Sequence, residues 1–188
     1  MVRRNILTLI TALSALVLTL ACGAVSSRIE SGKANKLVDE ANAANAEAAK
    51  SMEDVNKRFA QLFNGEVDLD DRKKYEPTTK DALEALDKAH AKLVEGTQKL
   101  DTASKMGVED WYKEYLSTMS QSYRNTDQQC DVLKEMAKVY VDYSIDADTL
   151  RARYKELFDK NDKLEKEAAD IDAKIKKIEA ANKDKMKA

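Results

Sequence analysis

The chain has 188 residues, of which 32 are basic and 34 are acidic, so its formal net charge is only −2. A charge this balanced lacks the basic excess of nucleic-acid-binding proteins and therefore argues against nucleic acid as a partner. The chain has only five glycines and one proline. Because these residues usually interrupt strands and turns, their scarcity predicts long helices.

The first 22 residues have the pattern of an export signal. Arg3 and Arg4 precede an apolar run, from about Ile6 to Ala21, that ends at Cys22. A charged start, a short apolar stretch and a small residue before the cut are typical of a secretory signal peptide. The run is shorter than the ~20 residues that a membrane-spanning helix needs. We therefore predict a signal peptide at residues 1–21, with an uncleaved anchor as the alternative.

The Ala21–Cys22 junction resembles the signal peptides of bacterial lipoproteins, in which the Cys after the cut is acylated. Ala21 matches that pattern, whereas Thr19 and Leu20 stand where Leu and then Ala or Ser are usual, so a plain secreted protein is a further alternative. The resemblance implies fatty-acyl chains, such as palmitate, on Cys22 and attachment to a bacterial membrane. Gly23 stands where an Asp would resemble an inner-membrane retention signal. In a Gram-negative cell this implies the outer membrane, facing the periplasm.

Removal of residues 1–21 leaves about 170 residues, a size that fits one domain. We predict a lipid-anchor linker at residues 22–30 and a helical bundle domain at residues 31–188. The cut removes two basic and no acidic residues, so the net charge becomes −4. Cys130 is then the only thiol that is not acylated, and we expect it to be buried.

The first two predicted helices are separated by residues 64–76. The first spans about Ser31 to Phe63, and its small residues at 41–49 would allow a neighbouring helix to approach closely. Pro77 suits the first turn of the second helix, which is expected to begin near position 78. Spacings of three and four residues define one apolar stripe on each helix. These stripes are Leu37, Ala41, Ala44, Ala48, Met52, Val55, Phe59 and Leu62, and then Leu83, Leu86, His90, Leu93, Thr97, Leu100 and Ser104.

The third predicted helix opens at residues 108–110, after Gly107, and the fourth follows residues 144–148. Their stripes are Tyr112, Leu116, Met119, Tyr123, Thr126, Cys130, Leu133, Ala137 and Tyr140, and then Leu150, Tyr154, Leu157, Asn161, Leu164, Ala168, Ile171, Ile175 and Ile178. Asn161 is a polar residue on an apolar stripe, and such a residue can determine helix register.

Residues 144–148 contain neither Gly nor Pro, and the helical spacing continues through Ser144 and Ala147. Two architectures therefore compete. We favour a tight hairpin, because Ser and Asp prefer helix caps and a hairpin gives helices of comparable length. The predicted fold is all-α, an antiparallel up-down-up-down four-helix bundle with coiled-coil-like packing. A three-helix arrangement with one very long C-terminal helix is the alternative.

Candidate chemistry is sparse in this sequence. His90 is the only histidine, and a haem- or metal-binding bundle that uses it, with Met119 as a second haem ligand, is a further alternative function. No Cys-x-x-Cys-His motif supports covalent haem attachment. The acidic segment Asp68–Asp71 lacks the spaced ligands of a calcium-binding loop. We therefore predict no enzymatic activity and no cofactor.

Two sets of residues are candidates for contacts with partners. Tyr75, Trp111 and Tyr143 are the aromatic residues best placed for a protein partner. A lysine-rich C-terminal region could contact a membrane surface beside Trp111: Lys174, Lys176, Lys177, Lys183, Lys185 and Lys187.

These features predict a membrane-anchored cell-envelope lipoprotein that acts as a non-enzymatic structural or protein-binding helical module. Its partners would be the bilayer, through acylated Cys22, and an envelope protein. A periplasmic carrier of hydrophobic ligands, or a holdase-like chaperone, is the alternative. The helices also resemble those of cell-wall-associated lipoproteins, but the chain ends in Ala188 and not in the Lys through which the murein lipoprotein type is attached.

Overall fold

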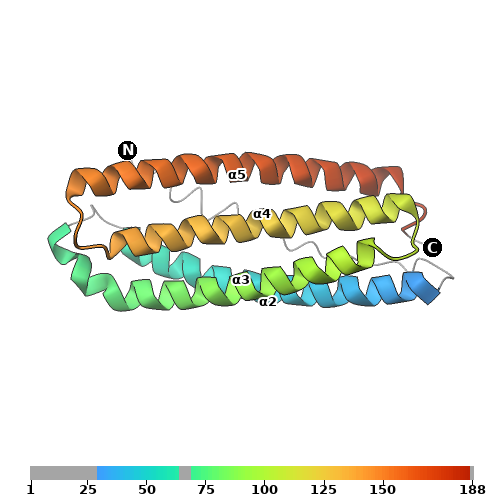
Figure 1. The fold of residues 1–188 in the computed structure, drawn as a ribbon, viewed down its shortest axis with the longest axis horizontal. Helices are drawn as coiled ribbons and strands as arrows, with labels where there is room; N and C mark the ends of the chain where they lie inside the picture. The colour runs from blue at the N-terminus through green and yellow to red at the C-terminus, as the bar shows by residue number, and fades with distance from the viewer. Residues whose placement is uncertain (1–28, 64–68, 187–188) are drawn as a thin grey trace.

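The computed structural model describes residues 29–63 and 69–186, and this part of the chain forms four long α-helices that run alternately up and down (Figure 1). They are α2 (Ile29–Phe63), α3 (Glu76–Ser104), α4 (Asp110–Tyr140) and α5 (Ala147–Ala181). Each helix packs against the one before it. The predicted antiparallel four-helix bundle is therefore confirmed. The predicted signal peptide, Cys22 and Lys187 lie outside the described residues.

The chain reverses between α4 and α5 at residues 141–146, so the hairpin is formed and the single long C-terminal helix is not. Asp146 caps α5, because its side chain accepts a hydrogen bond from the backbone N–H of Thr149 at 2.7 Å. Close to the loop, the Tyr154 hydroxyl donates to the backbone oxygen of Met136 at 3.1 Å. The capping preference of Asp thus outweighs the continuous helical spacing.

The segment before α3 is more helical than the sequence predicts. Residues 69–75 form a 3₁₀ helix, η2 (Leu69–Tyr75), within the stretch expected to be non-helical. α3 begins at Glu76, two residues earlier than expected, with Pro77 in its first turn. Proline is tolerated there because the first N–H groups of a helix have no partner within the helix.

The predicted stripes of α2 and α4 are largely buried, and α4 is the most buried helix of the bundle. α4 lies between α3 and α5 and also reaches α2, as shown by the hydrogen bonds from Tyr112 to Asn35 and from Tyr123 to Asn42. It therefore buries further residues beyond the predicted stripe: Tyr115, Thr118, Ser120, Ser122, Asn125, Gln129, Val132, Met136 and Val139.

The predicted stripe of α3 is partly wrong. Leu83, His90, Thr97 and Ser104 are only half-buried. The buried face is instead centred on small side chains and comprises Thr79, Ala82, Ala85, Leu86, Ala89, Leu93, Gly96, Leu100 and Ala103. Small residues let α2 and α4 approach closely, so the face rich in Ala turns inward while the longer side chains lie at its edges.

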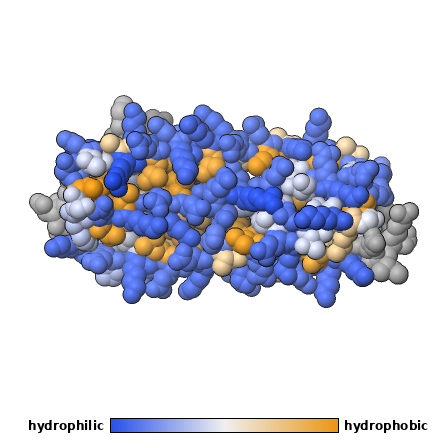
Figure 2. All heavy atoms as spheres, in the orientation of Figure 1, coloured by the Kyte–Doolittle hydropathy of each residue, from blue (hydrophilic) through white to orange (hydrophobic). Residues whose placement is uncertain are grey.

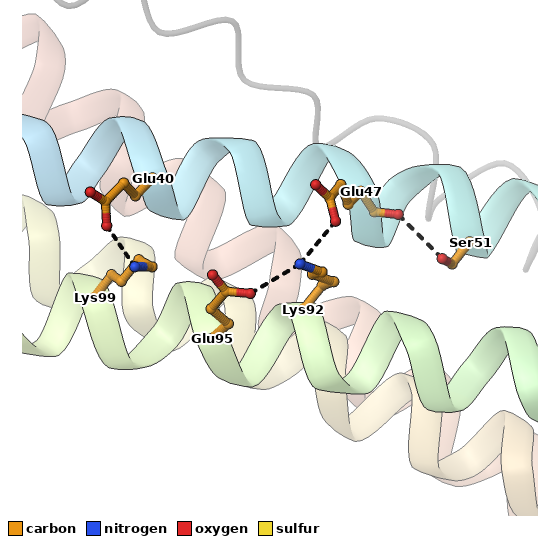
Figure 3. Close-up of polar contacts among 6 residues, drawn as sticks. All are labelled: Glu40, Glu47, Ser51, Lys92, Glu95 and Lys99. Atoms are coloured by element: carbon orange, nitrogen blue, oxygen red, sulfur yellow. Dashed lines mark hydrogen bonds and ion pairs between the residues drawn. The ribbon is translucent and has the colours of Figure 1, made fainter.

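α2 and α3 are joined by ion pairs on their outer faces (Figure 3). The Lys99 ammonium lies 2.6 Å from a carboxylate oxygen of Glu40, and the Lys92 ammonium lies 2.9 Å from Glu47 and 3.1 Å from Glu95. The hydrogen bond from Lys99 lowers the pKa of Glu40. Exposed pairs of this kind add little stability, so the alanine-rich core rather than the ion pairs holds this interface.

α5 is the least buried of the long helices. Its buried residues are Leu150, Tyr154, Asn161, Leu164, Ile175 and Ile178, and it packs chiefly along α4. Hydrophilic residues cover most of the face drawn in Figure 2, with hydrophobic patches between them. Tyr143 is the one large hydrophobic residue with an exposed side chain among the residues that the structure describes.

Candidate functional sites at the two ends of the bundle

The bundle has two ends of different chemistry. We call the end formed by the start of α2, the turn at residues 105–109 and the end of α5 the proximal end, because it is nearer to Cys22 in the chain (Figure 1). The distal end is formed by the end of α2, η2, the start of α3 and the loop at residues 141–146.

At the proximal end, Trp111 lies half-buried on the ring of Tyr112, with 5.4 Å between the ring centroids. Its indole N–H donates to a carboxylate oxygen of Glu109 at 2.7 Å. The Lys185 ammonium lies 3.1 Å from the same Glu109 oxygen and 5.9 Å from the centroid of the Trp111 ring. The fold therefore brings together the aromatic and the lysine-rich candidates that the sequence placed at one end.

Two tyrosines tie three helices together beneath Trp111. The Tyr112 hydroxyl donates to the Asn35 side-chain oxygen on α2 at 2.7 Å, and the Tyr115 hydroxyl donates to Glu179 on α5 at 3.2 Å. The two tyrosine rings are stacked, with their centroids 6.2 Å apart. Trp111 thus packs against a pair of stacked tyrosines whose hydrogen bonds connect α4 to α2 and α5.

Three of the predicted membrane-contact lysines form ion pairs. Lys174 lies 3.4 Å from Glu114, Lys176 lies 2.5 Å from Asp172, and Lys185 is bound to Glu109. Lys177 and Lys183 are exposed. Because these pairs neutralise part of the positive charge, its attraction to anionic lipid is weaker than the count of lysines implies.

At the distal end, the Arg72 side chain joins η2 to the loop at residues 141–146. Arg72 is 6% exposed, and its two terminal nitrogens donate to the backbone oxygens of Asp142 at 3.2 Å and Ile145 at 3.4 Å. Arg72 is not among the candidate residues that the sequence pattern indicates. An arginine in an expected loop carries no sequence signal that distinguishes it from a solvated one.

The two tyrosine candidates at the distal end differ in exposure. Tyr75 is half-buried and packs edge-on against Tyr140, with 6.3 Å between the ring centroids. Tyr143 is 41% exposed, and Arg72 and Lys73 lie 5.7 and 5.8 Å from the centroid of its ring. Its hydroxyl lies 3.5 Å from a Glu76 oxygen. Tyr143 therefore remains the stronger surface candidate of the two.

His90 and Cys130 lie in ordinary structural settings. The His90 Nδ1 atom lies 2.6 Å from an Asp127 carboxylate oxygen, joining α3 to α4, and the histidine side chain is 42% exposed. Cys130 is fully buried, 3.5 Å from the Met52 sulfur, and burial raises the pKa of its thiol to about 12. In the described part of the chain, no group of three or more His, Cys, Asp or Glu side chains is arranged to hold a metal ion.

Buried polar residues lie between α4 and α5. The Asn125 amide donates to the backbone oxygen of Leu164 at 3.1 Å, and Gln129 donates to Asn125 at 3.0 Å. Asn161 has no exposed surface; its amide nitrogen donates to Glu165 at 2.8 Å, while its side-chain oxygen has no hydrogen-bond partner. Asn161 was expected at this contact, but Asn125 and Gln129 lie off the predicted stripe and were missed.

Across residues 29–63 and 69–186, the structure contains no helix with the length and hydropathy needed to cross a bilayer. The chain matches no protein-family model, and comparisons with curated proteins and with solved structures found no similar protein.

Proposed function

We propose that this protein is an exported, lipid-anchored cell-envelope lipoprotein that serves as a non-enzymatic structural or protein-binding helical module. The observation that carries the proposal is the sequence before the bundle. An apolar run ending in Ala21–Cys22 is followed, seven residues after Cys22, by the start of α2. Acyl chains on Cys22 would thus be joined to the bundle by a short linker, and more than one chain makes a stable anchor.

The chemistry of the proximal end supports this orientation. Trp111 has an apolar ring and a polar N–H, which suits the boundary between lipid and water. Lys177 and Lys183 are exposed at the same end, where basic residues are attracted to anionic headgroups. α4 has 31 residues and is therefore about 46 Å long. An anchored proximal end would hold the distal end, with Tyr143, away from the bilayer for a partner.

The anchor is tested by labelling cells with a fatty-acid analogue and comparing Cys22→Ser with Cys130→Ser. The first variant should lose the label and membrane retention, whereas the second should keep both, because Cys130 is buried in the bundle core. Equal labelling of Cys22→Ser and the unchanged chain would refute the lipoprotein assignment.

The protein-binding role is tested with a photo-crosslinking amino acid at position 143. The matched control carries it at Lys50, an exposed position on α2 away from both ends. One defined envelope protein should be captured from position 143 and not from position 50. Identical capture patterns at the two positions would contradict a specific distal binding surface.

A further inference from the structure

The loop between α4 and α5 consists of residues that can also continue a helix. Residues 141–146 contain neither Gly nor Pro. Helical spacings of four, three, three and four residues lead from Tyr140 through Ser144, Ala147 and Leu150 to Tyr154. If this loop became helical, the buried stripe of α4 would continue into that of α5. The sequence at this point is therefore compatible with a continuous helix as well as with the closed hairpin that the structure shows.

The contact between α4 and α5 is specific for α5 as a partner. Asn125 and Gln129 on α4 and Asn161 on α5 are buried polar residues, and Asn125 donates to the backbone of α5 at Leu164. Buried polar residues at a helical contact select register and partner because mismatched pairing leaves them unsatisfied. Tyr115 on α4 also donates to the side chain of Glu179 on α5 at 3.2 Å, an acceptor that an unrelated amphipathic helix would not carry at that place. The α5 helix of a second copy would reproduce each of these contacts.

Arg72 holds the loop in its closed conformation. Its guanidinium donates to the backbone oxygens of Asp142 and Ile145, which lie on either side of the reversal. In a continuous helix these two oxygens would accept hydrogen bonds from N–H groups four residues further along the chain. The closed loop and the continuous helix therefore compete for the same acceptors.

From these contacts we propose that the face of α4 covered by α5 is also the docking surface for α5 of a second copy, and that the two copies exchange α5 by opening the loop at residues 141–146. Since every contact between α4 and α5 is remade between chains, the balance between monomer and exchanged dimer depends mainly on the two loops. Arg72 is the residue that keeps this balance toward the monomer.

The exchanged dimer has a defined shape. A continuous helix from Asp110 to Ala181 has 72 residues and is about 108 Å long. Tyr154 contacts Met136 within one chain, nine residues on either side of residue 145. A two-fold axis near residue 145 therefore places Tyr154 of each chain beside Met136 of the other. The two proximal ends then lie at opposite ends of the dimer, so the upright arrangement proposed above applies to the monomer, and a dimer anchored at both ends would lie along the bilayer.

Two substitutions act on the loop in opposite directions. Arg72→Met removes the donors to Asp142 and Ile145 while keeping an apolar stem. Ala147→Pro suits the closed hairpin, because position 147 is the first residue of α5 and Asp146 before it is extended, with ψ at 173°. The same proline would break a continuous helix. It therefore blocks exchange without disturbing the hairpin.

The test uses the full chain in detergent, refolded at a series of concentrations and examined by sedimentation and light scattering. In the unchanged chain, exchange breaks the Arg72 contacts to the closed loop in both copies. Arg72→Met removes these contacts from the monomer, so it should lower the dimer dissociation constant about tenfold or more. Adding Ala147→Pro to Arg72→Met should return the protein to monomer. The proposal is overturned if folded Arg72→Met remains as monomeric as the unchanged chain, or if its dimer persists with Ala147→Pro.

A second measurement separates exchange from simple side-by-side association. Chains with a spin label at Glu135 are refolded together with chains labelled at Lys155, two exposed positions at equivalent levels of α4 and α5. In the exchanged dimer these labels lie on neighbouring helices of different chains, so mixed dimers should show strong dipolar coupling. Absence of coupling in the mixed dimer would also overturn the proposal.

Discussion

Substitution of Gly96 by Ala gives a sharp test of how α3 packs. Gly96 is buried on α3, and a Cβ atom there would lie 2.8 and 2.9 Å from two ring carbons of Tyr123 and 3.3 Å from the backbone oxygen of Ala41. The shortest of these distances is about 0.6 Å below the 3.4 Å at which ordinary contact begins. The ring has little room to retreat, because Tyr123 is 3% exposed and its hydroxyl is bonded to Asn42.

Two effects of opposite sign decide how much Gly96→Ala changes the free energy of unfolding. Alanine is favoured over glycine inside a helix by about 1 kcal/mol. Overpacking of a close-packed core costs about 1–3 kcal/mol, and here two ring atoms and a backbone atom are involved, so the upper half of that range applies. We expect Gly96→Ala to lower the free energy of unfolding by about 1–2 kcal/mol. For a chain of this size, the unfolding temperature should fall by about 2–8 °C.

Urea and thermal unfolding followed by circular dichroism measure this change, with Gly32→Ala as the matched control. Gly32 is an exposed residue of α2 and has no atom within 4 Å of its added Cβ, so alanine there should leave stability unchanged or raise it. Combining Gly96→Ala with Tyr123→Leu should reduce the penalty, because the ring that causes the clash is removed. A Gly96→Ala variant as stable as the unchanged chain would refute this packing.

Three further outcomes are expected. Burial raises the pKa of Glu165, so the ionised carboxylate lowers the stability of the fold above that pKa. Glu165→Gln should therefore raise the unfolding temperature at pH 7, with a smaller gain at pH 4. An equal gain at both pH values would contradict this. The buried Cys130 thiol, with its pKa raised to about 12, should react with a thiol reagent at pH 8 only on unfolding, and rapid labelling of the native protein would contradict its burial. A chain beginning at Ser27 contains every described helix, and it should bind anionic vesicles weakly and lose that binding in high salt. Truncation of this chain after Ile178 should weaken vesicle binding. Unchanged binding would exclude the lysine-rich region from membrane contact.

Much of the architecture follows from local features of the sequence. The four stripes, the capping preference of Ser and Asp and Gly107 between the second and third helices are enough to predict four helices and a hairpin at residues 144–148, and the structure places the reversal at residues 141–146. The up-down topology then predicts that Trp111 and the lysine-rich region share one end. These inferences succeed because helix spacing and caps depend on residues close together in the chain.

Tertiary packing decided which face of α3 is buried. The periodicity of leucines placed His90 on the inner stripe, yet the face that turns inward carries Gly96 and a row of alanines, and His90 lies at its edge beside Asp127. Alanine and glycine carry a weak hydrophobic signal. Their burial is decided by how closely two other helices approach, and that distance depends on residues such as Ala41 and Tyr123, far away in the chain.

The same reason explains the two polar features that the sequence did not reveal. Arg72 is buried only because the loop at residues 141–146 folds over it, and Asn125 is buried only because α5 lies across the side of α4 on which it stands. On the sequence alone, both resemble solvated polar residues. The sequence by itself determined where helices form and reverse, whereas the tertiary structure decided which polar side chains lose water, because that depends on what another helix or loop covers.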